Sequence, residues 1–160
     1  MYHTVVIGGG CLGAATAVSL QKKLNKLGKG EKVGLIEKAV LCAAESSRHS
    51  GIVRSANADP DASMMASIST KMWKNIRDHW GIDMELDEFG AIWIAKKNSD
   101  GDNPAWTDLS KRMEKINLVF EEIDPDSAIQ KCGTTLITDK DESYFYEPAA
   151  FQLDPSILRS

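Results

Sequence analysis

Hydrophobic residues in the first 40 positions follow two different patterns. Residues 4–7 form a largely apolar run, which is typical of a strand that is covered on both faces, as in a parallel sheet. Residues 11–26 place apolar side chains mostly three or four positions apart, which predicts a helix. Residues 33–36 form a second apolar run. The order strand, helix, strand predicts a β-α-β unit with two parallel strands.

The pattern after position 40 predicts a loop, then helices and short strands. Small and polar residues fill positions 43–55, which we expect to be a loop. A helix is predicted from Pro60, with Asp59 as its N-cap, to the residue before Gly81. We expect the methionines of this helix to belong to the core. Residues 87–90 are expected to be a turn between two strands. The remaining predictions are strands at 84–86, 91–95, 118–121 and 143–146, and helices at 104–116 and 125–131.

Composition and charge narrow the class of protein. Of the 160 residues, 42% are apolar and 26% charged, which is typical of a globular chain and not of a disordered one. Because 19 Lys and Arg face 23 Asp and Glu, we do not expect a nucleic-acid partner. No apolar run approaches the ~20 residues of a transmembrane helix, and no secretory signal is indicated. We therefore expect a cytoplasmic protein, with peripheral membrane association left open.

The chain has three cysteines, Cys11, Cys42 and Cys132. An odd number of cysteines at wide spacing predicts neither a disulfide framework nor a metal site. We therefore expect reduced thiols and no metal, which suits a cytoplasmic compartment.

A glycine-rich motif follows the first predicted strand. Gly8, Gly10 and Gly13 match the pattern G-x-G-x-x-G, with Cys11 and Leu12 between the last two glycines. The first glycine permits a tight turn, the second lets the backbone approach a pyrophosphate, and the third lets helix and strand pack closely. The N-terminus of the next helix offers N–H groups and partial positive charge to phosphate. Because the motif lies between a strand and a helix, it predicts dinucleotide binding.

An acidic residue, Glu37, ends the second predicted strand, and Lys38 follows it. A carboxylate at this place can accept hydrogen bonds from an adenosine ribose, and it would repel a 2′-phosphate, which disfavours NADP. The alternative is a glycine-rich turn with a helix-capping surface glutamate and no ligand. The agreement of strand, glycines, helix, strand and acid favours the dinucleotide. These features alone leave both FAD and NAD possible.

The segments after Glu37 carry a family resemblance. Residues 48–52 read Arg-His-Ser-Gly-Ile, and 146–148 and 152–155 read Tyr-Glu-Pro and Gln-Leu-Asp-Pro. With the Val-Val-Ile-Gly-Gly-Gly start, they resemble the FAD-dependent oxidoreductases of the D-amino-acid oxidase superfamily. That group includes glycine and sarcosine oxidases, dimethylglycine dehydrogenase and L-2-hydroxyglutarate dehydrogenase. His49 stands where the family frequently has asparagine. The resemblance covers nearly the whole chain.

The resemblance implies FAD as the cofactor. It places Ser46 and Ser47 near the pyrophosphate and the segment from Arg48 beside the isoalloxazine ring, where a cation can stabilise an anionic reduced flavin. Some relatives attach the flavin through a histidine of this loop. That position falls on Arg48, with His49 one residue away, so we expect non-covalent FAD. The residues expected to bind the cofactor are Gly8, Gly10, Cys11, Leu12, Gly13, Glu37, Lys38, Ser46, Ser47, Arg48, His49, Ser50, Gly51 and Ile52.

The expected function is the oxidation of a small-molecule substrate by hydride transfer to flavin. The substrate would be a small amine, an amino acid or a 2-hydroxy acid, and the cofactor would carry the chemistry. The sequence assigns no catalytic residue. Arg48 is the first choice for a charge beside the flavin, and Arg54 the second. Two alternatives stay open: an NAD-dependent dehydrogenase, and a non-catalytic dinucleotide-binding fragment or interaction module.

The expected fold class is α/β: a Rossmann-type, FAD-binding β-α-β unit followed by the beginning of an α+β substrate lobe. We assign residues 1–82 to the FAD-binding domain, 83–150 to the substrate lobe and 151–160 to a return toward the FAD-binding domain, with a helix beginning near 155. Two parallel strands leave edges and faces uncovered. We therefore expect the N-terminal part of a flavoenzyme roughly two to three times longer, or a chain completed by a partner, so that activity of this chain alone is in doubt.

Overall fold

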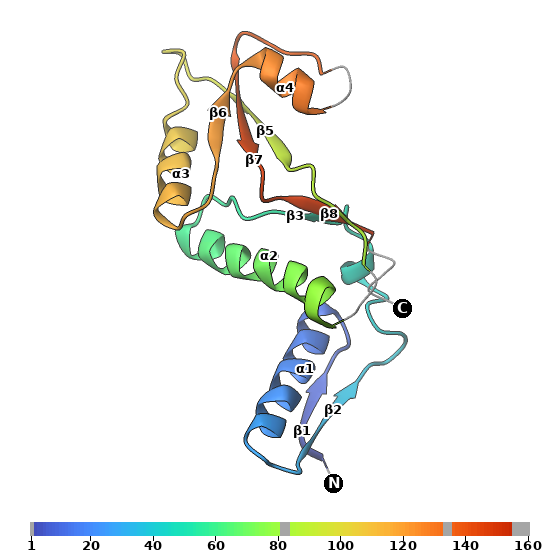
Figure 1. Cartoon of the computed structure of the whole chain (residues 1–160). Helices are drawn as coiled ribbons and strands as arrows, with labels where there is room; N and C mark the ends of the chain where they lie inside the picture. Colours follow the sequence, from blue (N-terminus) through green and yellow to red (C-terminus); the bar gives the residue numbers. More distant parts are fainter. Residues whose placement is uncertain (1, 81–83, 133–135, 155–160) are drawn as a thin grey trace. The chain divides into compact units, whose positions relative to one another are not determined.

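The computed structural model describes residues 2–80, 84–132 and 136–154 (Figure 1). Its described residues fall into two compact units. One unit comprises those of Met1–Gly51 and Asp154–Ser160, and the other comprises those of Ile52–Leu153. Each unit has its own strands and helices.

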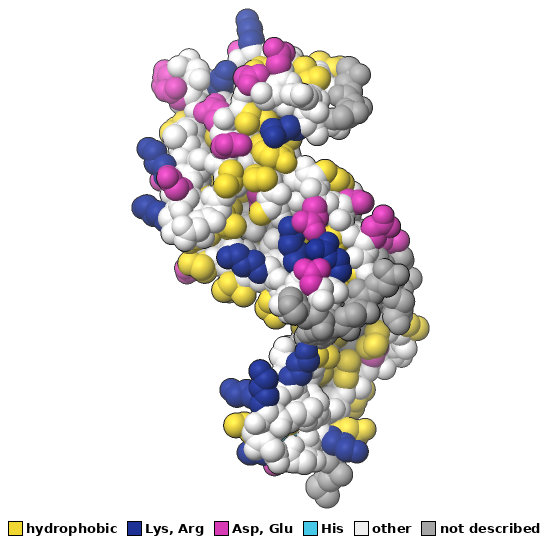
Figure 2. Space-filling model, in the orientation of Figure 1, with side chains coloured by type: hydrophobic (Ala, Val, Ile, Leu, Met, Phe, Trp, Pro, Cys, Tyr) yellow, Lys and Arg dark blue, Asp and Glu magenta, His cyan; other side chains and the backbone are white. Residues whose placement is uncertain are grey.

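The first unit is a β-α-β arrangement, as the sequence predicts. Strand β1 (Tyr2–Ile7), helix α1 (Cys11–Lys26) and strand β2 (Lys32–Ile36) follow one another, and the two strands pair in parallel. The side chain of Gln21 ties the helix to the start of β2, because its Oε1 accepts the N–H of Val33 at 2.8 Å. Figure 2 shows basic side chains over the part of the molecule that holds α1. Those in the last turn of α1 suit the negative end of the helix dipole.

One face of the β1–β2 sheet is apolar and exposed. Val6 faces α1, since it lies under Gly13 of that helix, and neighbouring residues of a strand point to opposite faces. Ile7 and its register partner Ile36 therefore share the other face, where their side chains are 85% and 57% exposed. Such a face is typical of a sheet that packs against further structure.

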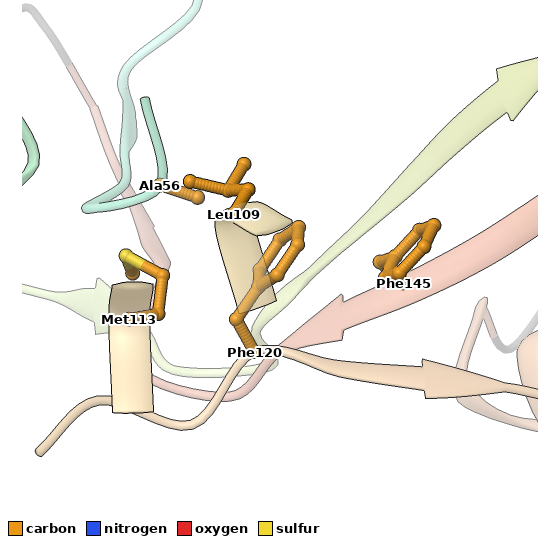
Figure 3. Packing of buried hydrophobic residues seen from close by; sticks show 5 residues of the cluster. All are labelled: Ala56, Leu109, Met113, Phe120 and Phe145. Carbon is orange, nitrogen blue, oxygen red and sulfur yellow. The ribbon is translucent and has the colours of Figure 1, made fainter. Parts of the chain in front are cut away.

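The second unit contains an antiparallel sheet with its own core. Strand β7 (Glu142–Glu147) lies between β5 (Ala91–Lys96) and β6 (Glu121–Ile123). Helix α3 (Pro104–Lys115) supplies Leu109 and Met113 to the core, as Figure 3 shows. Its other members are Ala56, Phe120 and Phe145. The rings of Phe120 and Phe145 stack with their centroids 5.4 Å apart and their planes at 6°.

A second, smaller sheet in this unit joins three short strands. Strand β8 (Phe151–Leu153) pairs antiparallel with β3 (Ile52–Val53) on one side and β4 (Leu86–Asp87) on the other. Helix α2 (Pro60–Trp80) follows β3, and Asp59 is its N-cap as predicted, because Asp59 Oδ1 accepts the N–H of Asp61 at 3.0 Å. Lys74 and Arg77 of α2 form ion pairs with Glu88. Near the centre of the view in Figure 2, basic and acidic side chains lie together.

The structure differs from the sequence predictions in several elements. The strands expected at 84–86 and 91–95 do not form a hairpin: β4 pairs with β8 and β5 with β7, so 87–90 connects two sheets. The loop expected at 43–55 contains a 3-10 turn, η1 (Glu45–Ser47), and strand β3. The strand expected at 118–121 begins only at Glu121, because Leu118 still caps α3 through its N–H to Met113 O.

The methionines of α2 were expected in the core, and this prediction is wrong. Met64, Met65 and Met72 are exposed, Met65 to 68%.

The helix predicted near 155 lies outside the described residues. Helix α4 (Pro125–Cys132) agrees with its prediction. No helix of the part of the chain that the structure describes is long and apolar enough to cross a membrane.

Candidate dinucleotide-binding site

The glycine turn after β1 is held by the end of β2. Gly8 has a φ of +102°, which favours glycine, and its N–H donates to Ile36 O at 2.8 Å. Gly9 is held on both sides: its N–H donates to Glu37 Oε2 at 2.8 Å, and its carbonyl accepts the N–H of Cys42 at 2.9 Å. The turn is therefore fixed by backbone and side-chain partners from one segment that follows it in sequence.

The N-terminus of α1 begins immediately after this turn. Gly10 is its N-cap residue and has no side chain with which to cap the helix. The N–H of Cys11 instead donates to Ser46 Oγ at 3.0 Å. A Cβ on Gly10 would come within 3.1 Å of the same hydroxyl oxygen. A helix N-terminus of this kind, with N–H groups and a serine hydroxyl beside them, is an arrangement that binds phosphate in other proteins.

The third glycine of the motif is required by packing. A Cβ on Gly13 would overlap the carbonyl oxygen of Gly8. The first turn of α1 thus lies directly against the turn that leaves β1, which is the role that the spacing predicts for this glycine.

The carboxylate of Glu37 is held by backbone donors at the end of β2. Its Oε2 accepts the N–H of Gly9, and its Oε1 accepts the N–H of Ala39 at 3.0 Å. The hydrogen bond from Gly9, followed by that from Ala39, lowers the pKa of Glu37 below its usual value. The group is therefore ionised at neutral pH. Each carboxylate oxygen has two lone pairs, so it can still accept further hydrogen bonds, such as those of ribose hydroxyls.

The loop from Cys42 to Gly51 is held by contacts within the loop and by contacts of Cys42 with Gly9. Cys42 has a φ of +55°, which is uncommon for a residue with a side chain, and it is buried with its Sγ 3.7 Å from Gly9 O. Ser47 Oγ donates to Ala44 O at 3.3 Å inside η1. His49 Nδ1 accepts the N–H of Gly51 at 2.9 Å, which places the proton of a neutral imidazole on Nε2.

The structure brings part of the predicted set together. Gly8, Gly10, Gly13, Glu37 and Ser46 meet around the start of α1. Other members of the set are exposed: Leu12, Lys38, Arg48 and Ser50. Ile52 lies in the other compact unit, as the first residue of β3.

Cys42 has a place in the site that the sequence did not indicate. It supports Gly9 through its backbone and covers the turn with its buried thiol. No local pattern marks a cysteine for a left-handed backbone conformation, because glycine and asparagine are the residues that adopt it readily.

Comparisons with known proteins give the site its context. The family model described as FAD dependent oxidoreductase matches residues 3–158. The comparison with curated proteins finds no match. Among solved structures, L-proline dehydrogenase from P. horikoshii is similar with a TM-score of 0.78 and 19% identity, over 98% of this chain and 39% of that chain.

Two further solved structures agree. L-amino acid deaminase from Proteus vulgaris has a TM-score of 0.76 and 20% identity, over 99% of this chain and 37% of that chain. Glycine oxidase from Geobacillus kaustophilus has a TM-score of 0.72 and 19% identity, over 99% of this chain and 42% of that chain. The chain thus spans about two fifths of the length of the structures that it matches. With the family model matching nearly its whole length, this chain belongs to the FAD-dependent oxidoreductase family.

Proposed function

We propose that this chain is the N-terminal, FAD-binding portion of a flavoenzyme that oxidises a small amine or amino acid by hydride transfer to flavin. The observation that carries the proposal is the meeting of the N-terminus of α1, whose N-cap residue is a glycine, with an ionised Glu37 at the glycine turn. The names of the similar structures, a proline dehydrogenase, a glycine oxidase and an amino acid deaminase, favour an amino acid over a 2-hydroxy acid.

The residues around the start of α1 fit the adenosine diphosphate half of FAD. The first N–H groups of α1 and the Ser46 hydroxyl would hold the pyrophosphate, and Glu37 would accept hydrogen bonds from the ribose. Gly10 fits this role because a Cβ there would crowd Ser46 Oγ. When bound, FAD supplies the ring that accepts the hydride. The protein's contribution is to hold and orient it.

The loop after η1 would serve the flavin end of the cofactor. Arg48 is exposed at the end of η1 and would supply positive charge. The family's attachment position falls on Arg48, and the neighbouring His49 ring accepts the N–H of Gly51 through Nδ1. We therefore propose non-covalent FAD. Acid precipitation of the flavin-loaded protein should leave the yellow colour in the supernatant, and colour on the polypeptide would contradict this.

The extent of the domain is a separate proposal. The exposed apolar face that includes Ile7 and Ile36, and the share of the similar structures that the chain covers, support completion by further sequence or by a partner chain. The functional boundaries at 82 and 150 stay predictions, and the compact units divide at Gly51 and Leu153 instead. We also propose a cytoplasmic location, which the absence of a disulfide among the cysteines of the described residues supports.

Ligand binding to the purified chain tests the proposed function. FAD and NAD are titrated separately, with flavin fluorescence and thermal unfolding as readouts. We expect saturable binding of FAD and no response to NAD. A colourless protein that NAD stabilises would favour a dehydrogenase of the nicotinamide type. If neither nucleotide binds to this chain or to a longer chain that includes the downstream sequence, the dinucleotide proposal fails.

A further inference from the structure

Glu147 is a buried carboxylate whose hydrogen-bond partners are N–H groups. Its side chain lies at the end of β7 and the residue is 0% exposed. Oε1 accepts the backbone N–H of Ser55 and, at 3.2 Å, that of Ala56. Oε2 accepts Nε1–H of Trp93 at 3.1 Å. These three donors replace the water that burial removes from the carboxylate. Glu147 therefore joins β7 to β5 and to the segment after β3.

Arg54 lies against two of the groups that Glu147 holds. Its Nη1 donates to Ala56 O at 2.8 Å, and its Cζ lies 4.4 Å from the ring centroid of Trp93. The contact with the ring is a cation–π interaction. The residue is exposed, so its guanidinium keeps access to solvent on the side away from the ring.

The position of the Trp93 ring is also fixed by two neighbouring aromatic rings. Its centroid lies 5.6 Å from that of Trp106 and 6.2 Å from that of Phe120, with tilted and edge geometries. Those contacts place the ring in the aromatic core, and the hydrogen bond to Glu147 fixes the direction of the indole N–H. Together they determine which face of the ring Arg54 meets.

We propose that Glu147 is a positioning residue that holds the Arg54 guanidinium in place through Ala56 and Trp93. Arg54 follows Ile52, the last residue expected to bind the cofactor, by two positions. The positioning itself depends only on contacts within one compact unit.

The three donors explain why the residue is a carboxylate. A glutamine has one acceptor oxygen and an NH₂ group that only donates. In Glu147→Gln, that NH₂ group would face either the indole N–H of Trp93 or the backbone N–H groups. At least one buried N–H would then lose its partner, which is costly in a buried place. Either Ala56 or Trp93, the two residues that Arg54 contacts, would then no longer be held by residue 147.

Side-chain NMR of the full chain without cofactor tests this inference. The readouts are the ring-current shift of the Arg54 δ-methylene protons and the order parameter of its Nε–H bond. We expect Glu147→Gln to remove most of the upfield shift and to lower the order parameter from the rigid range of about 0.85 to below about 0.6. Glu142→Gln is the control, because it makes the same charge change on the same strand.

The outcomes separate positioning from general destabilisation. Arg112, whose Nη1 also donates to a backbone carbonyl, that of Ala58 at 2.7 Å, should keep its order parameter in both variants. A folded Glu147→Gln protein with an unchanged Arg54 would overturn the inference. If that variant does not fold, Trp93→Phe keeps a ring but deletes the indole N–H, and an unchanged Arg54 order parameter there overturns it too. If neither the wild-type chain nor the longer chain binds FAD, the proposed function is rejected and this result still stands.

Discussion

The backbone N–H of Gly9 and Oε2 of Glu37 are joined by a hydrogen bond of 2.8 Å. This bond links the turn that leaves β1 to the residue that ends β2, so the two carboxyl ends of the parallel strands are held together. In open α/β sheets, ligands bind at that edge. The carboxylate is therefore oriented by the protein itself, which reduces the ordering cost that a ligand would otherwise meet on binding.

The first prediction concerns the charge of Glu37. Glu37→Gln removes the negative charge and replaces one acceptor oxygen by an NH₂ group, so it cannot accept from both Gly9 and Ala39. We expect FAD to bind about tenfold more weakly or worse, as for the loss of a hydrogen bond to a charged group. Fluorescence titration measures the affinity. Glu31→Gln makes the same charge change just before β2 and should leave the affinity unchanged. Equal affinities for the wild type and Glu37→Gln would contradict the ribose role.

A pH dependence of stability follows from the same group. The pKa of Glu37 is lowered in the folded chain from its ordinary value of 4.5, chiefly by the hydrogen bond from the N–H of Gly9. Its contribution to stability is therefore fully present above about 4.5 and is lost as the pH falls through the lower folded value. Other carboxyl groups with lowered pKa, such as Glu88, act in the same direction. Urea midpoints between pH 7 and pH 3 should fall less steeply in Glu37→Gln, and parallel curves would argue against the assignment.

The close contact of α1 with the glycine turn makes Gly13 sensitive to substitution. In Gly13→Ala, the new Cβ would overlap the carbonyl oxygen of Gly8, and the helix would have to move. We expect a loss of about 1–3 kcal/mol in unfolding free energy, as for overpacking, together with weaker FAD binding. Gly30→Ala is the control, because no heavy atom lies within 4 Å of a Cβ there. Denaturant unfolding measures the unfolding free energy of both variants. Equal losses in Gly13→Ala and Gly30→Ala would refute the steric role of Gly13.

Gly90 tests a second steric contact, in the other unit. Gly90 has a φ of +80°, and a Cβ there would lie 2.6 Å from Cε2 of Tyr146, whose hydroxyl donates to Phe89 O at 3.2 Å. Gly101 has the same φ of +80° but open space around it. Gly101→Ala should therefore cost only the conformational term, about 1–2 kcal/mol, and Gly90→Ala more. The difference between their unfolding free energies measures the clash with Tyr146, and a difference of zero would exclude it.

Local patterns predicted the β-α-β unit, because its determinants lie within a few residues of one another. The apolar runs of β1 and β2, the glycine spacing and the capping of α2 by Asp59 all act over short distances. Gly13 also makes the close contact between helix and turn that its spacing implied. The family resemblance is confirmed by the family model.

Other features depend on partners far along the chain, which local patterns do not reveal. β4 and β5 resemble the arms of a hairpin in sequence, but their partners are β8 and β7, more than 45 residues away. The burial of Glu147 follows from three N–H donors that converge on it from two other segments. A glutamate at the end of a strand ordinarily lies in solvent, so no local pattern marks this one as buried.

The pairing of Ile52 with Gln152, and of Leu86 with Leu153, also has a consequence for biosynthesis. β3 and β4 leave the ribosome before their shared partner β8 has been made, so this sheet cannot form until translation has passed residue 153. The contacts of β1, α1 and β2 are complete by residue 36 and can form first, as expected for domains that fold from the N-terminus during synthesis. Long-range strand pairing is slow, so the nascent chain exposes β3 and β4 as unpaired edges for that interval.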